Sequence, residues 1–202
     1  PLASCTSLSS ADETNSPNST ALKCGAIAVD VSPTTFPVIV NGMFEERTAD
    51  KVADRLHARA FVLASGSTKL AIVVVDSCML PRELLDEAKT RAAKIIGIPT
   101  DHILISATHT HSAPASMGCL GSRPDPAYPK FLIPQLVRAI QLANERLQPA
   151  QIGWASTHAP KYTYCRRYIR RPDRLIKDPF GELNVRANMH PGFLSPDAVG
   201  PS

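Results

Sequence analysis

A succession of strand, helix and strand constrains the fold of this chain most strongly. Residues 70–75 form an apolar run rich in β-branched side chains, and a second run of this kind covers 103–107. Between them lies a helical pattern that opens after Pro81 and stops at Gly97. A strand–helix–strand crossover within one sheet makes its two strands parallel and is right-handed in nearly all proteins. The sequence therefore predicts a β-sheet with helices packed against it.

Further strands extend this sheet in the opposite direction. Residues 24–31 and 56–63 are apolar runs of strand length, and the turn Ser65-Gly66-Ser67 lets 56–63 and 70–75 form an antiparallel hairpin. A second helix is predicted over 129–147. We therefore expect an α/β fold with a mixed β-sheet flanked by helices, and we expect it to be the amino-terminal part of a larger domain.

The remaining segments carry weaker patterns. Residues 36–54 are predicted to be a loop and 151–157 another strand, while regular patterning fades after Pro160, where prolines are frequent. The expected domain organisation is a leader remnant or flexible tether at 1–22, which is rich in Ser, Thr and Asn. One α/β domain follows at 23–202, and we expect it to be incomplete at its C-terminal end.

Composition and charge narrow the class of protein. With 202 residues, of which 44% are hydrophobic, the chain is long enough to bury the core of one α/β domain. The formal net charge of +4 is mild and its excess lies in residues 161–177, so we expect no nucleic-acid partner. The longest apolar runs have the length of strands, which is too short for a membrane-spanning helix. The five cysteines lack the Cys-x-x-Cys spacing of a structural zinc site.

The first residues indicate export. Leu2-Ala3-Ser4-Cys5 matches the end of a bacterial lipoprotein signal, in which the cysteine is lipidated, although the apolar stretch that precedes such a signal is absent. A chance match is the alternative. We expect a secreted, periplasmic or lipid-anchored protein, with association at a membrane surface through a lipidated Cys5.

The strand at 103–107 runs directly into two histidines separated by one residue, His109 and His111. In an extended chain, residues i and i+2 point to the same side, so both imidazoles would enter one space at the end of the sheet. Imidazole nitrogen is a common ligand of zinc. The alternative is a pair of polar residues that end a strand and form local hydrogen bonds. The buried strand before the pair favours the metal site.

Asp76 follows the strand at 70–75. If this strand and 103–107 are parallel neighbours, Asp76 and the two histidines lie at one edge, beyond the carboxyl ends of the strands, where open α/β sheets bind ligands. Asp76 can then bind a metal directly or orient an imidazole, and we assign it to the substrate-binding part of the site. The alternative is a carboxylate that caps the following loop.

The segment Thr108-His109-Thr110-His111-Ser112-Ala113-Pro114 resembles the Thr-His-Thr-His-Ser-Gly-Pro signature of the neutral/alkaline (non-lysosomal) ceramidase family, in its amino-terminal domain. Other blocks are similar to the family in the same order, and they are Gly25–Pro33, His57–Leu63, Ala71–Asp76 and Cys165–Tyr168. Two residues depart from the pattern. Ala113 replaces the usual glycine, and Cys165 stands where asparagine is common.

The resemblance implies a bound zinc ion with His109 as a ligand, and it implies that His111 is a catalytic residue that supports the site and the substrate. It also implies a catalytic, substrate-contacting arginine at Arg166, with Arg167 as a neighbouring substrate-binding residue. The further arginines of this segment are better explained as a solvated basic loop. The family's remaining zinc ligands, a second histidine, a glutamate and a tyrosine, have no match here.

The function implied by the resemblance is zinc-dependent hydrolysis of the N-acyl amide bond of ceramide-like lipids to fatty acid and sphingoid base. Its expected partners are the lipid amide substrate and the remainder of a longer chain, without which these 202 residues are expected to be inactive. One alternative is a non-catalytic ceramidase-like surface or binding protein, which the missing ligands favour. Another is a metallohydrolase for a different amide or ester.

Overall fold

The computed structural model describes residues 21–161, 165, 167–188 and 195–201. The chain divides into two compact units between Ile152 and Gly153, and each unit is described by itself. Cys5 and most of the predicted tether lie outside the described residues, so lipidation and the domain organisation stay predictions.

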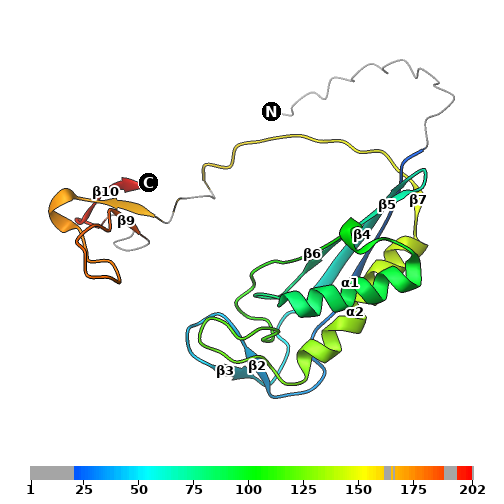
Figure 1. The fold of residues 1–202 in the computed structure, drawn as a ribbon, viewed down its shortest axis with the longest axis horizontal. Helices are drawn as coiled ribbons and strands as arrows, with labels where there is room; N and C mark the ends of the chain where they lie inside the picture. Colours follow the sequence, from blue (N-terminus) through cyan, green and yellow to red (C-terminus); the bar gives the residue numbers. More distant parts are fainter. Residues whose placement is uncertain (1–20, 162–164, 166, 189–194, 202) are drawn as a thin grey trace, which may run out of the picture. The chain divides into compact units, whose positions relative to one another are not determined.

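The first unit is built on a five-stranded sheet with the strand order β6-β5-β4-β1-β7 (Figure 1). Its strands are β1 (Lys23–Asp30), β4 (His57–Ser65), β5 (Thr68–Val75), β6 (Ile103–Ala107) and β7 (Gln148–Pro149). β6 is parallel to β5, whereas the other neighbouring pairs are antiparallel. The mixed sheet predicted from the sequence is confirmed.

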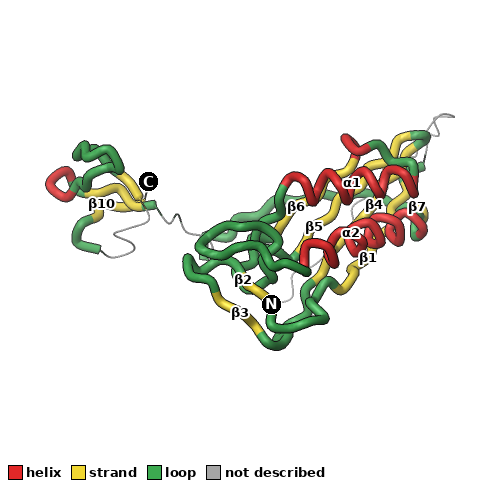
Figure 2. Tube along the Cα trace, turned by 60° about the horizontal axis from the view of Figure 1, so that its bottom comes forward, coloured by secondary structure: helices red, strands yellow, loops and turns green. Residues whose placement is uncertain are grey.

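Two helices lie against one face of this sheet, α1 (Arg82–Ile96) and α2 (Tyr128–Glu145) (Figures 1 and 2). α1 ends because Gly97 adopts a left-handed conformation with φ of 69°, which lets its N–H donate to the carbonyl of Ala93. Both predicted helices are therefore confirmed. The bounds of α1 agree with the prediction, and those of α2 are shifted by one residue at its start and two at its end.

Alternation along the strands decides which side chains face the helices. In β4 and β5 every second residue is buried, including Val62, Val73 and Val75. These side chains meet the buried face of α2, where Leu132, Leu136 and other apolar residues are fully enclosed. The core of the unit is thus the layer between the sheet and its helices.

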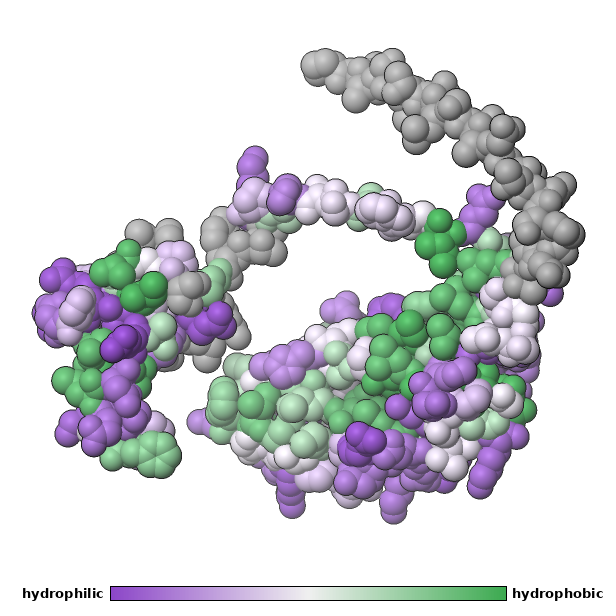
Figure 3. All heavy atoms as spheres, turned by 45° about the horizontal axis from the view of Figure 1, so that its top comes forward, coloured by the Kyte–Doolittle hydropathy of each residue, from purple (hydrophilic) through white to green (hydrophobic). Residues whose placement is uncertain are grey.

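The opposite face of the sheet carries the alternate residues, which are also apolar. Phe61, Ile72 and Leu104 are register partners across three strands, and Leu70 lies two residues before Ile72 in β5, on the same face. They are only partly buried, and the exposed fractions of Leu70 and Leu104 reach 43% and 55%. Apolar side chains gather visibly on the surface of this unit (Figure 3). The strands are therefore apolar on both faces, with one face covered by the helices.

Two predictions for the connecting segments were wrong. The predicted loop at 36–54 contains a short antiparallel pair, β2 (Val38–Val40) and β3 (Arg47–Ala49). The predicted strand at 151–157 is absent from the described structure, because β7 pairs with the first two residues of β1 and the following residues run past the end of that strand.

The second unit contains regular structure where sequence patterning fades. A three-stranded sheet has the order β10-β8-β9, formed by β8 (Tyr168–Arg170), β9 (Ala187–Asn188) and β10 (Ala198–Pro201). Two short 3₁₀ helices complete the described elements, η1 (Thr100–His102) in the first unit and η2 (Pro172–Arg174) in the second. In the part of the chain that the structure describes, no helix has the length and apolarity to cross a membrane.

Because the core lies between the sheet and the helices, two leucine substitutions should differ in their effect on the free energy of unfolding. Leu136→Ala removes a fully buried side chain from α2 and should lower the free energy of unfolding by about 3 kcal/mol. Leu104→Ala, at the exposed face of β6, should lower it by less than about 1 kcal/mol. Urea denaturation followed by circular dichroism measures both, and equal losses would show that the core has been assigned to the wrong face.

Candidate metal centre

The candidate site lies where the parallel strands β5 and β6 end. Backbone hydrogen bonds between the two chain segments continue past the ends of both strands. The Thr108 N–H donates to the carbonyl of Val75 at 2.9 Å, and the Thr110 N–H donates to the carbonyl of Ser77 at 3.1 Å. The two segments that leave the sheet therefore run side by side. The common edge predicted from the sequence is confirmed.

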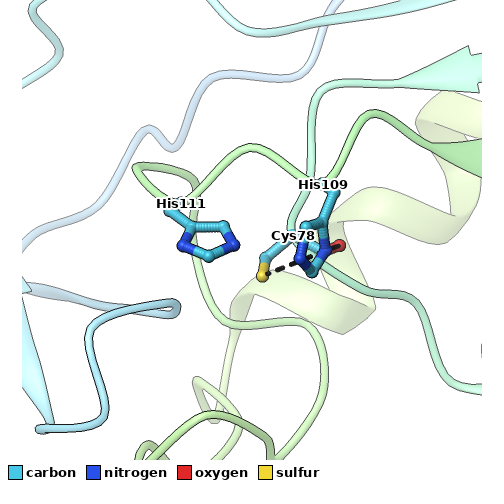
Figure 4. Close-up of side chains that lie close together, drawn as sticks. All are labelled: Cys78, His109 and His111. Carbon is cyan, nitrogen blue, oxygen red and sulfur yellow. Dashed lines mark hydrogen bonds between the residues drawn. The ribbon is translucent and has the colours of Figure 1, made fainter. Parts of the chain in front are cut away.

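His109 is fixed by the segment that follows β5. Its Nδ1 lies 3.0 Å from the backbone oxygen of Cys78 and 3.9 Å from the Sγ atom of the same residue (Figure 4). A carbonyl oxygen only accepts, so Nδ1 carries the proton and donates it to this oxygen. In the neutral imidazole with this hydrogen bond, Nε2 is the nitrogen with a free lone pair, so it is the atom that could bind a metal.

The backbone of His109 is unusual, with φ of +62° in the left-handed region. This conformation is uncommon for a residue with a side chain and is found disproportionately at functional sites. It also changes the reason why the two histidines meet. They were predicted to share a side because the chain is extended, but a left-handed residue turns the chain at His109. The rings of His109 and His111 nevertheless lie edge to face, with centroids 4.6 Å apart.

Cys78 completes a cluster of three donors with these histidines. One ligand atom from each of Cys78, His109 and His111 lies within 4.8 Å of the others. Figure 4 shows the sulfur and the two imidazoles gathered at one place. Both imidazoles are accessible, whereas Cys78 is buried, with 1% of its surface exposed. The three side chains can therefore hold a metal ion with one side open to solvent.

The chemistry of the three donors fits a divalent ion of the zinc type. Thiolate and imidazole are the ligands that zinc prefers, and a catalytic zinc site has three protein ligands and an open position. Burial raises the pKa of the Cys78 thiol, and neighbouring Cys119 raises it further. The thiol is therefore protonated at neutral pH when no cation lies beside it, and a bound metal would provide the positive charge that stabilises the thiolate.

β2 and the residues after it hold His111 in place. Gly42 has φ of +112°, and a Cβ atom there would lie 2.6 Å from Cβ and Cγ of His111. Arg47 donates from Nη2 to the backbone oxygen of His111 at 2.7 Å. The imidazole thus packs directly on the backbone of Gly42, in a space that only glycine leaves open.

The same region anchors the loop that follows His111. Asn41 is fully buried, and its Nδ2 donates to the carbonyl of Met117 at 3.1 Å and to Oγ of Ser122 at 3.0 Å. The Ala115 N–H donates to the backbone oxygen of Ile39 at 2.7 Å. The loop is therefore held by hydrogen bonds to Ile39 and Asn41, which limits the movement of His111.

Asp76 lies at the same edge but has other partners. Its Oδ2 accepts from the backbone N–H of His57 at 2.9 Å and from Nη1 of Arg59 at 2.8 Å. The carboxylate thus joins the end of β5 to the start of β4, as a structural residue would. Its assignment to substrate binding stays a prediction.

The two arginines taken from the resemblance are not brought to the site by the structure. Arg166 lies outside the described residues, and Arg167 is an exposed residue of the second unit. Their roles stay predictions. The candidate metal donor that the sequence interpretation missed is Cys78. Its position two residues after Asp76 was the available signal, because it places Cys78 at the edge where the histidines lie.

Comparison with known proteins supports the fold. No family model matches the sequence. A neutral ceramidase from Pseudomonas aeruginosa is similar in structure, with a TM-score of 0.58 and 24% sequence identity over 64% of this chain. A ceramidase complexed with C2 is similar with a TM-score of 0.56 and 25% identity, also over 64% of this chain. The match covers 22% of each of those chains. The fold implied by the family resemblance is therefore confirmed.

Cobalt binding tests the three donors. Co²⁺ added to the protein should give a sulfur-to-cobalt charge-transfer band in the near ultraviolet, because a thiolate is among the ligands. Cys78→Ser should abolish the band, and His109→Ala should weaken binding at least about tenfold. His102→Ala is a matched control, because His102 also contacts a backbone oxygen, that of Lys69, but lies outside the cluster. A band that persists in Cys78→Ser would exclude the cysteine as a ligand.

Gly42→Ala tests the packing of His111. The added methyl group would overlap the imidazole, so His111 must move and metal affinity should fall at least about tenfold. Gly97→Ala is the control, because Gly97 also has a positive φ but has nothing within 4 Å of its Cβ position. Both variants carry backbone strain, and only Gly42→Ala should change the cobalt titration. An equal metal affinity in both variants would contradict this arrangement.

Proposed function

We propose that this chain contributes a metal centre to a zinc-dependent hydrolase that cleaves the N-acyl amide bond of ceramide-like lipids, releasing fatty acid and sphingoid base. The observation that carries the proposal is the cluster of Cys78, His109 and His111 at the open edge of a ceramidase-like fold. The identity of the metal and of the substrate is proposed from the donor chemistry and from the family resemblance of the His-Thr-His block.

Each residue of the cluster has a defined task in this proposal. His109 is oriented by its hydrogen bond to the Cys78 carbonyl, so that Nε2 is presented as a donor. Cys78 and His111 supply the second and third donors. When bound, zinc supplies Lewis acidity toward an amide carbonyl and toward water. The accessible side of the cluster is where an amide group would enter, and the buried side is closed by Cys78.

If His111 acts on the substrate rather than on the metal, the expected effect of His111→Ala is different. In the family resemblance this histidine supports the site and the substrate, so it would hold or transfer a proton while His109 and Cys78 hold the ion. His111→Ala would then keep the metal and lose the reaction. With His111 as the third donor, the same variant loses both.

The remaining parts of the proposal rest on the sequence. Arg166 and Arg167 would contact the substrate, because a guanidinium suits a carboxylate or a developing oxyanion. Export follows from the lipoprotein-like residues Leu2–Cys5, and it would place the protein where membrane lipids are accessible. The chain spans only 22% of the solved ceramidases that it matches, so we include further polypeptide among its proposed partners.

Metal content and hydrolysis of N-acylsphingosine by the natural polypeptide that contains these residues test the function. One zinc ion per chain and release of fatty acid are expected, and His109→Ala should lose both, since it removes the oriented donor. Metal without this activity would reject ceramide-like lipids as substrates and would favour another amide or ester. Absence of both would favour the non-catalytic binding protein. His102→Ala again serves as the control for loss of an imidazole.

A further inference from the structure

A cavity of about 310 Å³ lies beside the candidate metal centre, within the first unit. It is open to solvent on one side and is lined by three segments, namely β2 and β3 with their flanking residues, residues 51–56, and the residues that follow His111. Its volume falls at the lower end of the range for small-molecule sites. None of the three candidate metal donors lines the cavity, whereas Val38 of its wall also belongs to the core of the unit.

The cavity and the metal centre share one loop. Ser112 and Pro114 line the cavity and come directly after His111, and Pro114 forms an antiparallel bridge with Val40. Arg47 also lines the cavity, and its guanidinium donates to the backbone oxygen of His111 at 2.7 Å. The cavity is therefore joined to the metal centre by the loop that carries His111 and by the hydrogen bond of Arg47 to that residue.

The lining combines aliphatic walls with a positive rim. The aliphatic and proline side chains come from β2, β3 and both loops, and they are Pro33, Val38, Val40, Ala49, Val52, Ala53, Leu56 and Pro114. The charged residues are Arg47, Lys51 and Asp54, which leaves an excess of one positive charge. Arg47 and Lys51 are both exposed, so their charged groups are accessible at the rim.

We propose that this cavity binds a long-chain carboxylate, with the alkyl chain along the aliphatic walls and the carboxylate at Arg47 and Lys51. An arginine fork matches the two oxygens of a carboxylate, and the aliphatic walls remove the chain from water. The inference rests on the proposed function, in which a fatty acid is released at the neighbouring metal centre. It adds that the acyl half of the substrate is held by the first unit, on the Arg47 side of His111.

Binding of dodecanoate to the metal-free protein tests the inference directly. Isothermal titration calorimetry, below the micelle concentration, should show one site. Dodecyltrimethylammonium has the same alkyl chain with the opposite charge, and it should bind at least about fivefold more weakly because it meets the positive rim. Equal affinity for the two amphiphiles, or no binding of dodecanoate, would overturn the inference.

Two variants locate the binding site. Ala53→Trp places an indole at an exposed position of the lining and should weaken dodecanoate binding at least about tenfold by filling the cavity. Lys51→Glu reverses an exposed charge and should weaken it about fivefold, without a change in the packed core. Lys94→Glu, on the exposed side of the last turn of α1, is the matched control and should leave the affinity unchanged. Unchanged affinity in both cavity variants would place the site elsewhere.

Zinc content of the same samples separates this inference from the proposed function. Ala53→Trp and Lys51→Glu leave the three metal donors intact, so both should bind zinc like the parent protein. Dodecanoate binding without any zinc binding would support the cavity and contradict the metallohydrolase. Zinc binding without dodecanoate binding would contradict the cavity alone.

Discussion

The parallel pairing of β5 with β6 is the constraint on which the site depends. Hydrogen bonds continue past both strands, through Thr108 and Thr110, and hold the two exit segments side by side. Cys78 lies on one segment and His109 on the other, 31 residues later. α1 makes this parallel pairing possible because it carries the chain from the end of β5 back to the start of β6. Without the crossover, the Cys78 sulfur and the His109 imidazole would not lie at the same edge of the sheet.

A second set of contacts stabilises the two histidines, including a backbone conformation at His109 that is unfavourable in a free peptide. The left-handed backbone of His109 costs on the order of 1 to 3 kcal/mol, so the surrounding structure must determine it. The hydrogen bond to the Cys78 carbonyl does so on one side. On the other side the buried amide of Asn41 and the bare backbone of Gly42 fix the loop that carries His111. The candidate donors are therefore held in place by contacts within the protein itself.

The same loop connects two chemically different spaces. On one side are three donors suited to a borderline metal ion, and on the other is an aliphatic cavity with Arg47 at its rim. A lipid amide has a polar group that suits the first space and an acyl chain that suits the second. In the proposed function, both parts of the substrate would therefore be held by the first unit.

The sequence alone determined the elements whose signal is local. The crossover, the hairpin at Ser65–Ser67 and the two histidines after a buried strand follow from hydrophobic period, turn residues and spacing, and the structure contains all three. Tertiary structure decided the rest. Cys78 became a candidate donor, and Asn41 and Gly42 became supports of His111, through contacts with residues 31 or more positions away. The predicted strand at 151–157 failed for a related reason, since β1 had no residues left to pair with it. Local periodicity reports how each segment is buried, whereas the packing of distant segments decides which side chains meet.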